Sequence, residues 1–290
     1  MLSIVSKKTL EYKCKQIIKR IPLMSQILEC RDILLELRRM IGERTRQLAG
    51  IAMSEYLAKL LSSGKYTDPL NLNRYENQVF SRHGQDGLLS KIFRRIGHPS
   101  QYFVEVGAGN GRENNTAFWL IQGWEGCWVE AADLEAIKIR LQFHRQIAAG
   151  QLSFSQSMIT AENIEQVFRD NQVPEEFDLF SLDIDRNTYW VWKALKHYHP
   201  HVVVIEYNSL FRPPLEWVVE YDADREWNGT TYFGASLKSY EILGRELGYS
   251  LVGCELVGAD AFFVRSDLCD DKFQQPFSAE LHYEPPRHFL

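Results

Sequence analysis

Residues 101–132 read QYFVEVGAGNGRENNTAFWLIQGWEGCWVEAA. An apolar run over 102–106 follows turn-forming residues and predicts a short buried strand. A helix over about 113–122 and a second strand over 127–130 follow it. Between the first strand and the helix the backbone can bend sharply and approach a ligand closely, because three residues lack side chains: Gly107, Gly109 and Gly111. The stretch therefore predicts a ligand-binding strand, helix and strand.

The acidic residues of this unit indicate which ligand it binds. Glu130 ends the second strand about 20 residues after the glycine turn, where a carboxylate can accept hydrogen bonds from ribose hydroxyls. Glu105 precedes the turn and would repel a pyrophosphate. S-adenosylmethionine has a ribose, an ammonium and a sulfonium but no phosphate, so the residues favour it over a dinucleotide. The expected cofactor contacts are Gln85, Glu105, Gly107, Gly109, Asn110, Gly111, Glu130 and Asp183.

Strand and helix patterns alternate beyond Glu130. This alternation predicts an α/β fold with a doubly wound, mostly parallel sheet. In such sheets ligands bind beyond the carboxyl ends of the strands. The expected elements are a helix over 134–148, a strand over 152–158, a helix over 161–171 and strands over 177–184 and 201–205.

Polar side chains follow the last two of these strands. Asp183 and Asp185 end one strand, and Glu206 and Asn208 end the next. Oxygen ligands of this kind suit a hard cation such as Mg²⁺, so we expect these four residues to converge on a metal site. Asp183 and Asp185 are also candidate catalytic carboxylates. Alternatively, Asp183 contacts only the amino end of the cofactor, and Asp185 caps the helix that follows.

The stretch FSRHGQDG, residues 80–87, leads into an apolar helix pattern just before the first strand. Such a polar entry can fold over the ligand pocket. His83, Gln85 and Asp86 are therefore expected in the pocket, with His83 as a catalytic candidate. The alternative is that Ser81 and Asp86 only turn the chain and cap the helix.

Composition limits the class of protein. The chain has 290 residues, 45% of them apolar, and a net charge of −5, which is typical of a globular protein and argues against a broad nucleic-acid-binding surface. The five cysteines are odd in number and show no CxxC spacing. A disulfide framework is therefore not expected, and a cytoplasmic location is favoured.

The N-terminal region differs in charge. Residues 1–48 hold 11 Lys or Arg and 5 Asp or Glu, and they contain no apolar run long enough to span a membrane. Helical spacings there, with Pro22 separating two helices, predict packing on the main domain or on another subunit of a homo-oligomer. A second hypothesis is peripheral contact of this basic face with the inner membrane surface. The expected divisions are 1–61 (helical, basic), 62–77 (connector), 78–267 (cofactor domain) and 268–290 (tail).

Residues 75–267 resemble the FkbM-like S-adenosylmethionine-dependent methyltransferases. The resemblance lies in SRHGQDG, FVEVGAGNGRENNT, GWEGCWVEA, LFSLDIDRNTYWVWKAL, VVVIEYN, YFGASLKSYEILGRELGYSLVG and DAFFVR, in this order. It implies a class I methyltransferase fold of seven strands, with the last two as an antiparallel edge, and methylation of hydroxyls on sugars or natural products. It also implies that Asp183, Glu206 and Asn208 match the metal set of catechol-type O-methyltransferases.

The residues and the resemblance together predict an O-methyltransferase acting on a small-molecule or glycan acceptor. A polar and aromatic insert over 211–232 fits this hypothesis, because aromatic faces stack on sugars and charged groups bind their hydroxyls. Two alternatives stay open: an NAD-dependent oxidoreductase, and a non-catalytic, membrane-associated binding protein on a methyltransferase fold.

Overall fold

The computed structural model of the protein describes residues 22–225 and 227–289. These residues fall into two compact units, one ending at Leu60 and the other beginning at Leu61. Within the described residues the first unit consists of one helix, α2, Pro22–Leu61, whose 40th and last residue belongs to the second unit. It begins at Pro22, which suits a first helical turn because its missing N–H would be unpaired there anyway. The helix expected before Pro22 lies outside the described residues.

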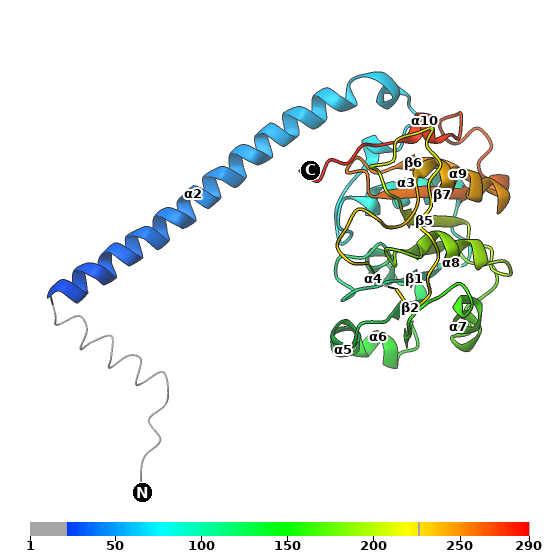
Figure 1. The fold of residues 1–290 in the computed structure, drawn as a ribbon, viewed down its shortest axis with the longest axis horizontal. Helices are drawn as coiled ribbons and strands as arrows, with labels where there is room; N and C mark the ends of the chain where they lie inside the picture. The colour runs from blue at the N-terminus through cyan, green and yellow to red at the C-terminus, as the bar shows by residue number, and fades with distance from the viewer. Residues whose placement is uncertain (1–21, 226, 290) are drawn as a thin grey trace, which may run out of the picture. The chain divides into compact units, whose positions relative to one another are not determined.

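The second unit is built on a seven-stranded sheet (Figure 1). The strand order is β3-β2-β1-β4-β5-β7-β6; β1 to β5 are parallel, and β7 runs antiparallel to β5 and β6. This confirms the predicted doubly wound, mostly parallel sheet of a class I methyltransferase fold. The strands are β1 Tyr102–Val106, β2 Glu125–Glu130, β3 Leu152–Gln156, β4 Leu179–Leu182, β5 Val202–Glu206, β6 Tyr249–Cys254 and β7 Asp260–Arg265.

Helices cover both faces of this sheet. Alternate residues of a strand point to opposite faces, so Val104 and Val106 of β1 pack in one apolar cluster and Phe103 in another. α7, Ile164–Asp170, α8, Thr188–Ala194, and α9, Leu237–Glu246, contribute to the first cluster. The second cluster includes residues of α3 Gln85–Ile96, α4 Ala117–Ile121 and α5 Asp133–Gln142, and α6 His144–Ala148 follows α5.

Two predicted helices differ from the observed ones. The helix expected over 113–122 begins only at Ala117, because the backbone N–H groups of Asn115 and Thr116 donate to the Glu105 carboxylate instead of opening the helix earlier. The helix expected over 134–148 is divided into α5 and α6 at Phe143. Phe143 packs edge-on against the Trp128 ring, with 4.7 Å between ring centroids. Side-chain partners from other elements therefore decide both boundaries.

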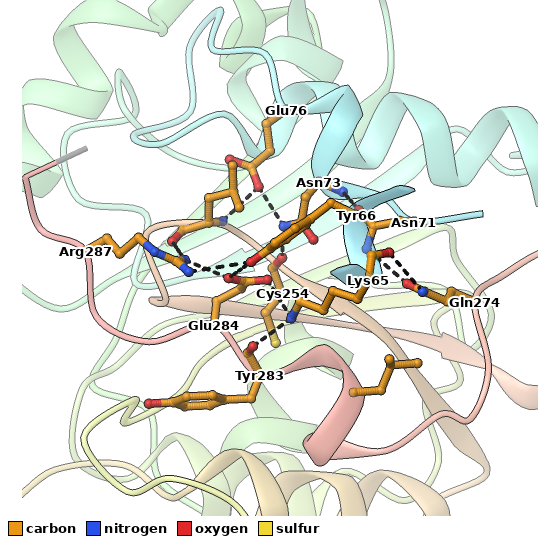
Figure 2. Close-up of polar contacts among 12 residues, drawn as sticks. Lys65, Tyr66, Asn71, Asn73, Glu76, Cys254, Gln274, Tyr283, Glu284 and Arg287 are labelled. Carbon is orange, nitrogen blue, oxygen red and sulfur yellow. Dashed lines mark hydrogen bonds and ion pairs between the residues drawn. The ribbon is translucent and has the colours of Figure 1, made fainter. Parts of the chain in front are cut away.

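The segments expected as connector and tail pack together in the second unit. The short helices within these segments are η1 Gly64–Thr67, η2 Asn73–Tyr75 and α10 Ala279–His282, and η3 Ser266–Leu268 lies at the start of the tail. Figure 2 shows three side chains pointing toward the fully buried Glu284 carboxylate. Tyr66 donates a 2.8 Å hydrogen bond to it, and Lys65 and Arg287 form ion pairs of 2.7 and 2.6 Å. We call residues 273–289 the C-terminal strap.

The C-terminal strap holds the turn between β6 and β7, residues 255–259. The Arg287 guanidinium donates to the Leu256 carbonyl, and the Arg287 backbone N–H donates to the Val257 carbonyl. A Cβ atom on Gly258 would lie 2.6 Å from the Pro285 carbonyl oxygen, so only glycine fits this contact. The strap thus fixes the start of β7, which lies beside the site described below.

Glu76 provides a test of this packing. Its carboxylate accepts hydrogen bonds from the Asn73 amide and the Leu256 backbone N–H, and burial raises its pKa to about 8. A carboxyl group whose pKa is raised on folding stabilises the protein at low pH and loses that contribution as the pH rises toward 8. Glu76→Gln imitates the protonated form. We therefore expect the wild type to lose roughly 2 to 3 kcal/mol relative to Glu76→Gln between pH 5.5 and 8.5.

The measurement is urea denaturation of both proteins at the two pH values. Comparing the two proteins separates the effect of Glu76 on stability from the effects of other carboxyl groups whose pKa is raised. A difference between wild type and variant that stays constant with pH would show that Glu76 is ionised in the folded protein throughout this range.

Candidate functional site

Gly107 lies where the ends of β1 and β4 meet. Its φ is +84°, and a Cβ atom there would lie 1.8 Å from the Asp183 carbonyl oxygen. The backbone N–H of Asp183 donates to the carbonyl of Val106, so the two chains are hydrogen-bonded at this point. The glycine predicted from the motif is therefore required by the close approach of two backbones, and this approach places Asp183 beside the glycine turn.

Two cavities open at this junction, and Gly107, Gly109 and Asp183 line both. The larger cavity has a volume of about 450 Å³, and the smaller one about 260 Å³. Glu130 lines the larger cavity, and its apolar lining comes from Val106, Val129, Met158, Ile159 and Ile184. One elongated ligand could therefore extend from a half-apolar cavity, past the glycine turn, into a polar one.

Glu130 joins the end of β2 to the glycine turn. One carboxylate oxygen accepts a 2.7 Å hydrogen bond from the Gly109 backbone N–H, and the other accepts one of 2.8 Å from Ala132. Each oxygen has a second acceptor position. The side chain lies in the wall of the larger cavity, as expected for a residue that binds ribose hydroxyls, and the protein already fixes its orientation.

The smaller cavity is strongly acidic. Glu105, Asp183, Glu206 and Asp260 line it, together with Glu113, the cation Arg82 and the imidazole of His83. Desolvation by the surrounding protein raises the pKa of Glu105 to about 7 and that of Asp183 to about 7, and the charges of Asp260 and Asp185 add to the rise at Asp183. The pKa values of Glu206 and Asp260 are raised as well, chiefly by burial. A cationic ligand would lower the cost of keeping these groups ionised.

Three of the predicted cofactor contacts also have structural roles. Glu105 is buried and accepts hydrogen bonds from the Asn115 and Thr116 backbone N–H groups, so it holds the loop that leads into α4. Asn110 lines the smaller cavity, and its side-chain oxygen accepts from the Arg112 N–H. A Cβ atom on Gly111 would lie 2.6 Å from the Trp128 ring. Gly111 therefore packs against the core and does not line either cavity.

The entry to α3 supplies one wall of the smaller cavity. His83 lines it, and burial and then the charge of Arg82 hold the pKa of its imidazole below the ordinary value. Gln85 also lines it, but its amide donates to Asp260 and accepts from the His83 backbone N–H, so both of its ends have protein partners. Asp86 accepts hydrogen bonds from three backbone N–H groups, those of residues 79–81. Asp86 therefore turns the chain before α3, as the alternative expected, and it lines neither cavity. It does not cap the helix; instead the Ser81 hydroxyl accepts from the Asp86 backbone N–H in the first turn.

Three carboxylates gather at the ends of β4 and β5. Asp183, Asp185 and Glu206 each offer an oxygen, and these oxygens lie within 4.8 Å of one another. Asp185 has a φ of +57°, a left-handed conformation that Asp tolerates better than most residues. Three carboxylate oxygens form a donor set that fits Mg²⁺, which accepts water or substrate oxygens at its remaining positions. Asp185, one of the four residues expected here, thus takes the place of Asn208, the third ligand that the resemblance implied.

Asn208, the expected third ligand, is held elsewhere. Its side chain is buried, and its amide nitrogen donates to the carbonyls of Thr231 and Phe233 at 2.9 and 3.1 Å. Its side-chain oxygen accepts from the Leu210 N–H. The structure therefore gives Asn208 the role of anchoring the insert rather than of joining the carboxylates.

The polar and aromatic insert, residues 211–232, lies over the larger cavity. Ala223, Arg225 and Trp227 line that cavity. Residues at the start of α8 hold the insert in place, because Arg186, Asn187 and Trp190 donate to the carbonyls of Glu220, Asp222 and Val219, respectively. Trp217 stacks on Phe211 with 4.2 Å between centroids. The insert thus presents one tryptophan to the cavity and uses another for its own packing.

Sequence reasoning missed Asp260. This residue begins β7 and pairs with Glu206 of β5, and its carboxylate accepts hydrogen bonds from Gln85 and Asn115. The signal was present in the sequence, because Asp260 is a charged residue that directly precedes four apolar residues of a buried strand. Since β7 is antiparallel, the beginning of that strand lies at the same sheet edge as the ends of β1 and β4.

The glycine turn offers a matched pair of variants. Gly107→Ala places a methyl group against the Asp183 carbonyl, whereas Gly109 also has a positive φ, of +55°, but open space around its Cβ position. We expect Gly107→Ala to destabilise the protein by more than about 3 kcal/mol and Gly109→Ala by about 1 to 2 kcal/mol. Chemical denaturation of the two variants measures both values. Equal losses would show that the β1–β4 junction can relax.

Neither protein-family models nor curated proteins give a match to this chain. Solved structures give matches at low identity. Magnesium protoporphyrin IX methyltransferase from Synechocystis, solved with bound S-adenosylmethionine, is 10% identical over 63% of this chain and 78% of its own, with a TM-score of 0.41. An S-adenosylmethionine-dependent methyltransferase from Clostridium acetobutylicum is 10% identical over 73% of this chain and 98% of its own, with a TM-score of 0.40.

A third similar structure is the glycopeptide N-methyltransferase MtfA, solved with S-adenosylhomocysteine. It is 13% identical over 67% of this chain and 95% of its own, with a TM-score of 0.38. TM-scores this low carry no argument about function. The class I methyltransferase fold of this chain therefore rests on its own strand order and strand directions.

Proposed function

We propose that the protein is an S-adenosylmethionine-dependent O-methyltransferase that acts on a hydroxyl of a sugar, a glycan or a related polyhydroxylated acceptor. The observation that carries this proposal is the acidic cavity beside the glycine turn, lined by Glu105, Asp183, Glu206 and Asp260. A dinucleotide would bring a pyrophosphate to this turn, where four carboxylates repel it. A sulfonium and an ammonium are instead attracted.

Each of the two cavities suits one part of the cofactor. The larger cavity suits the nucleoside, because Glu130 can bind the ribose and apolar residues such as Ile159 can contact the base. The smaller cavity suits the amino-acid end, because its carboxylates attract the ammonium and Arg82 can pair with the ligand carboxylate. Asp183 is the carboxylate shared by the two linings, so it borders the region between the nucleoside and the amino-acid end.

The chemistry requires a hydroxyl that has lost its proton. When bound, S-adenosylmethionine supplies a methyl group, whose bond to sulfur breaks as a bond to the acceptor oxygen forms. His83 is suited to take the hydroxyl proton, because its lowered pKa leaves the imidazole neutral at pH 7. Asp183 and Asp185 are the alternative proton acceptors. A divalent cation held by Asp183, Asp185 and Glu206 would lower the pKa of the acceptor hydroxyl and orient it.

The acceptor class follows from the insert. The insert borders the larger cavity through Trp227 and Arg225, and Asp222 pairs with Arg225 at 3.0 Å. Trp227 is 48% exposed, so its ring remains available to an acceptor that lies beside the bound nucleoside. An aromatic face next to paired charges suits a polyhydroxylated ligand, since the ring contacts C–H groups while the charges bind hydroxyls. This supports a sugar over an apolar acceptor.

A transfer assay tests the proposal. The protein is incubated with S-adenosylmethionine carrying a labelled methyl group and with panels of monosaccharides, oligosaccharides and catechols, each with EDTA or with Mg²⁺. We expect label on a hydroxyl of a polyhydroxylated acceptor, and a loss with EDTA that Mg²⁺ reverses. Transfer only to amines would contradict O-methylation. Transfer that EDTA does not reduce would exclude a role for a divalent cation.

Asp183→Asn distinguishes binding from chemistry. Removing its charge should lower transfer at least roughly 100-fold, because the residue serves the cation or the proton, while the affinity for S-adenosylhomocysteine changes less than about fivefold. Asp170→Asn, at the exposed end of α7, is the control and should change neither. Transfer at the wild-type rate in Asp183→Asn would exclude both roles.

A further inference from the structure

Helix α2 carries a row of exposed apolar side chains. Ile27, Leu34, Leu37, Ile41, Leu48 and Ile51 are between 47% and 67% exposed, and we call these six residues the α2 seam. Large aliphatic side chains on an isolated helix are costly to leave in water, and most of the stability of a helix in water comes from covering such a face. We therefore expect another apolar surface to cover the α2 seam.

The spacing of the α2 seam identifies the kind of partner. Ile27, Leu34, Ile41 and Leu48 recur every seven residues, and Leu37 and Ile51 take the intermediate position of the same repeat. Positions that alternate by three and four residues form the contact line of a coiled coil. At 1.5 Å per residue the α2 seam extends over about 36 Å. Its length and its period both match another helix with the same repeat.

The charges of α2 favour a protein partner over a lipid surface. Residues 22–61 hold six Lys or Arg and five Asp or Glu, so α2 is close to neutral. Away from the α2 seam the two signs are mixed, and Arg31 pairs with Asp32 and Arg39 with Glu43 within the helix. A helix that lies on an anionic membrane needs a basic polar face, which α2 lacks. In the described part of the chain we also find no helix that could serve as a membrane span, α2 included.

Arg44 sets the direction of pairing. It is exposed and occupies the same position of the seven-residue repeat as Leu37 and Ile51, although it is not apolar. In a parallel, in-register pair the two Arg44 side chains would face each other across an apolar contact, which costs energy because like charges repel there. In an antiparallel pair centred between residues 42 and 43, Arg44 instead lies opposite Ile41 of the second copy. The same arrangement places Leu34 opposite Ile51 and Leu37 opposite Leu48.

We propose that α2 pairs with α2 of a second copy of this chain, as an antiparallel coiled coil formed by the α2 seam. Ile33 and Met40 flank the seam and widen its apolar face, whereas Leu35 projects from the opposite side of the helix. This pairing is independent of the proposed enzymatic activity, since it involves neither cavity.

Sedimentation velocity of the full chain tests the pairing. We expect the wild type to sediment as a dimer at micromolar concentration. Leu37→Glu should raise the dissociation constant roughly 100-fold or more, because it introduces one charge from each copy into the contact. Leu35→Glu is the matched control, with the same substitution two residues away on the other side of the helix, and it should remain a dimer. A monomeric wild type, or equal dissociation of both variants, would overturn the proposal.

Cysteine cross-linking tests the direction. Cys30 is an exposed free thiol that occupies the same position of the seven-residue repeat as Leu37. A parallel, in-register pair would therefore bring the two Cys30 side chains together. We expect no cross-linked dimer through Cys30 on mild oxidation of a Cys14→Ser variant. Leu34→Cys combined with Ile51→Cys, with Cys14 and Cys30 replaced by Ser, should give a disulfide-linked dimer. Cross-linking through Cys30 with none in the double variant would overturn the antiparallel arrangement.

Discussion

The contact between Gly107 and the Asp183 carbonyl is the constraint on which the site depends. Two parallel strands end side by side, and one backbone can pass the other only because Gly107 lacks a side chain and adopts a positive φ. This contact fixes the glycine turn against the end of β4. Asp183 therefore lines both cavities, and Glu130 can hold the turn from the other side through the Gly109 N–H.

The acidic cavity follows from the same arrangement. Parallel strands β1, β4 and β5 bring Glu105, Asp183 and Glu206 to one edge, and the antiparallel β7 adds Asp260 from the opposite direction. The C-terminal strap holds the turn before Asp260, so a segment far from the motif supports the cavity. Carboxylates that share a desolvated space have raised pKa values, and a bound cation relieves their repulsion. This repulsion between carboxylates is the physical reason for proposing a sulfonium cofactor.

The sequence predicted the sheet well, because buried parallel strands are short apolar runs between turn residues, as at 102–106 and 202–206. It placed Glu130 and Gly107 at the glycine turn for the same reason, since their positions depend on local spacing. Asn208 and Asp260 could not be assigned from local spacing. Whether an amide faces a cavity or the carbonyls of Thr231 and Phe233 depends on how an insert folds back, and such tertiary contacts leave no periodic pattern.

Calorimetric titration with S-adenosylhomocysteine and, separately, with NAD tests the central claim most directly. The account predicts that the wild type binds S-adenosylhomocysteine in the micromolar range and NAD at least tenfold more weakly. Glu130→Ala should lower the affinity for S-adenosylhomocysteine at least tenfold. Glu125→Ala, at the exposed start of β2, should leave that affinity unchanged. Preference for NAD, or no binding of either ligand, would contradict the assignment of the acidic cavity and the glycine turn to a sulfonium cofactor.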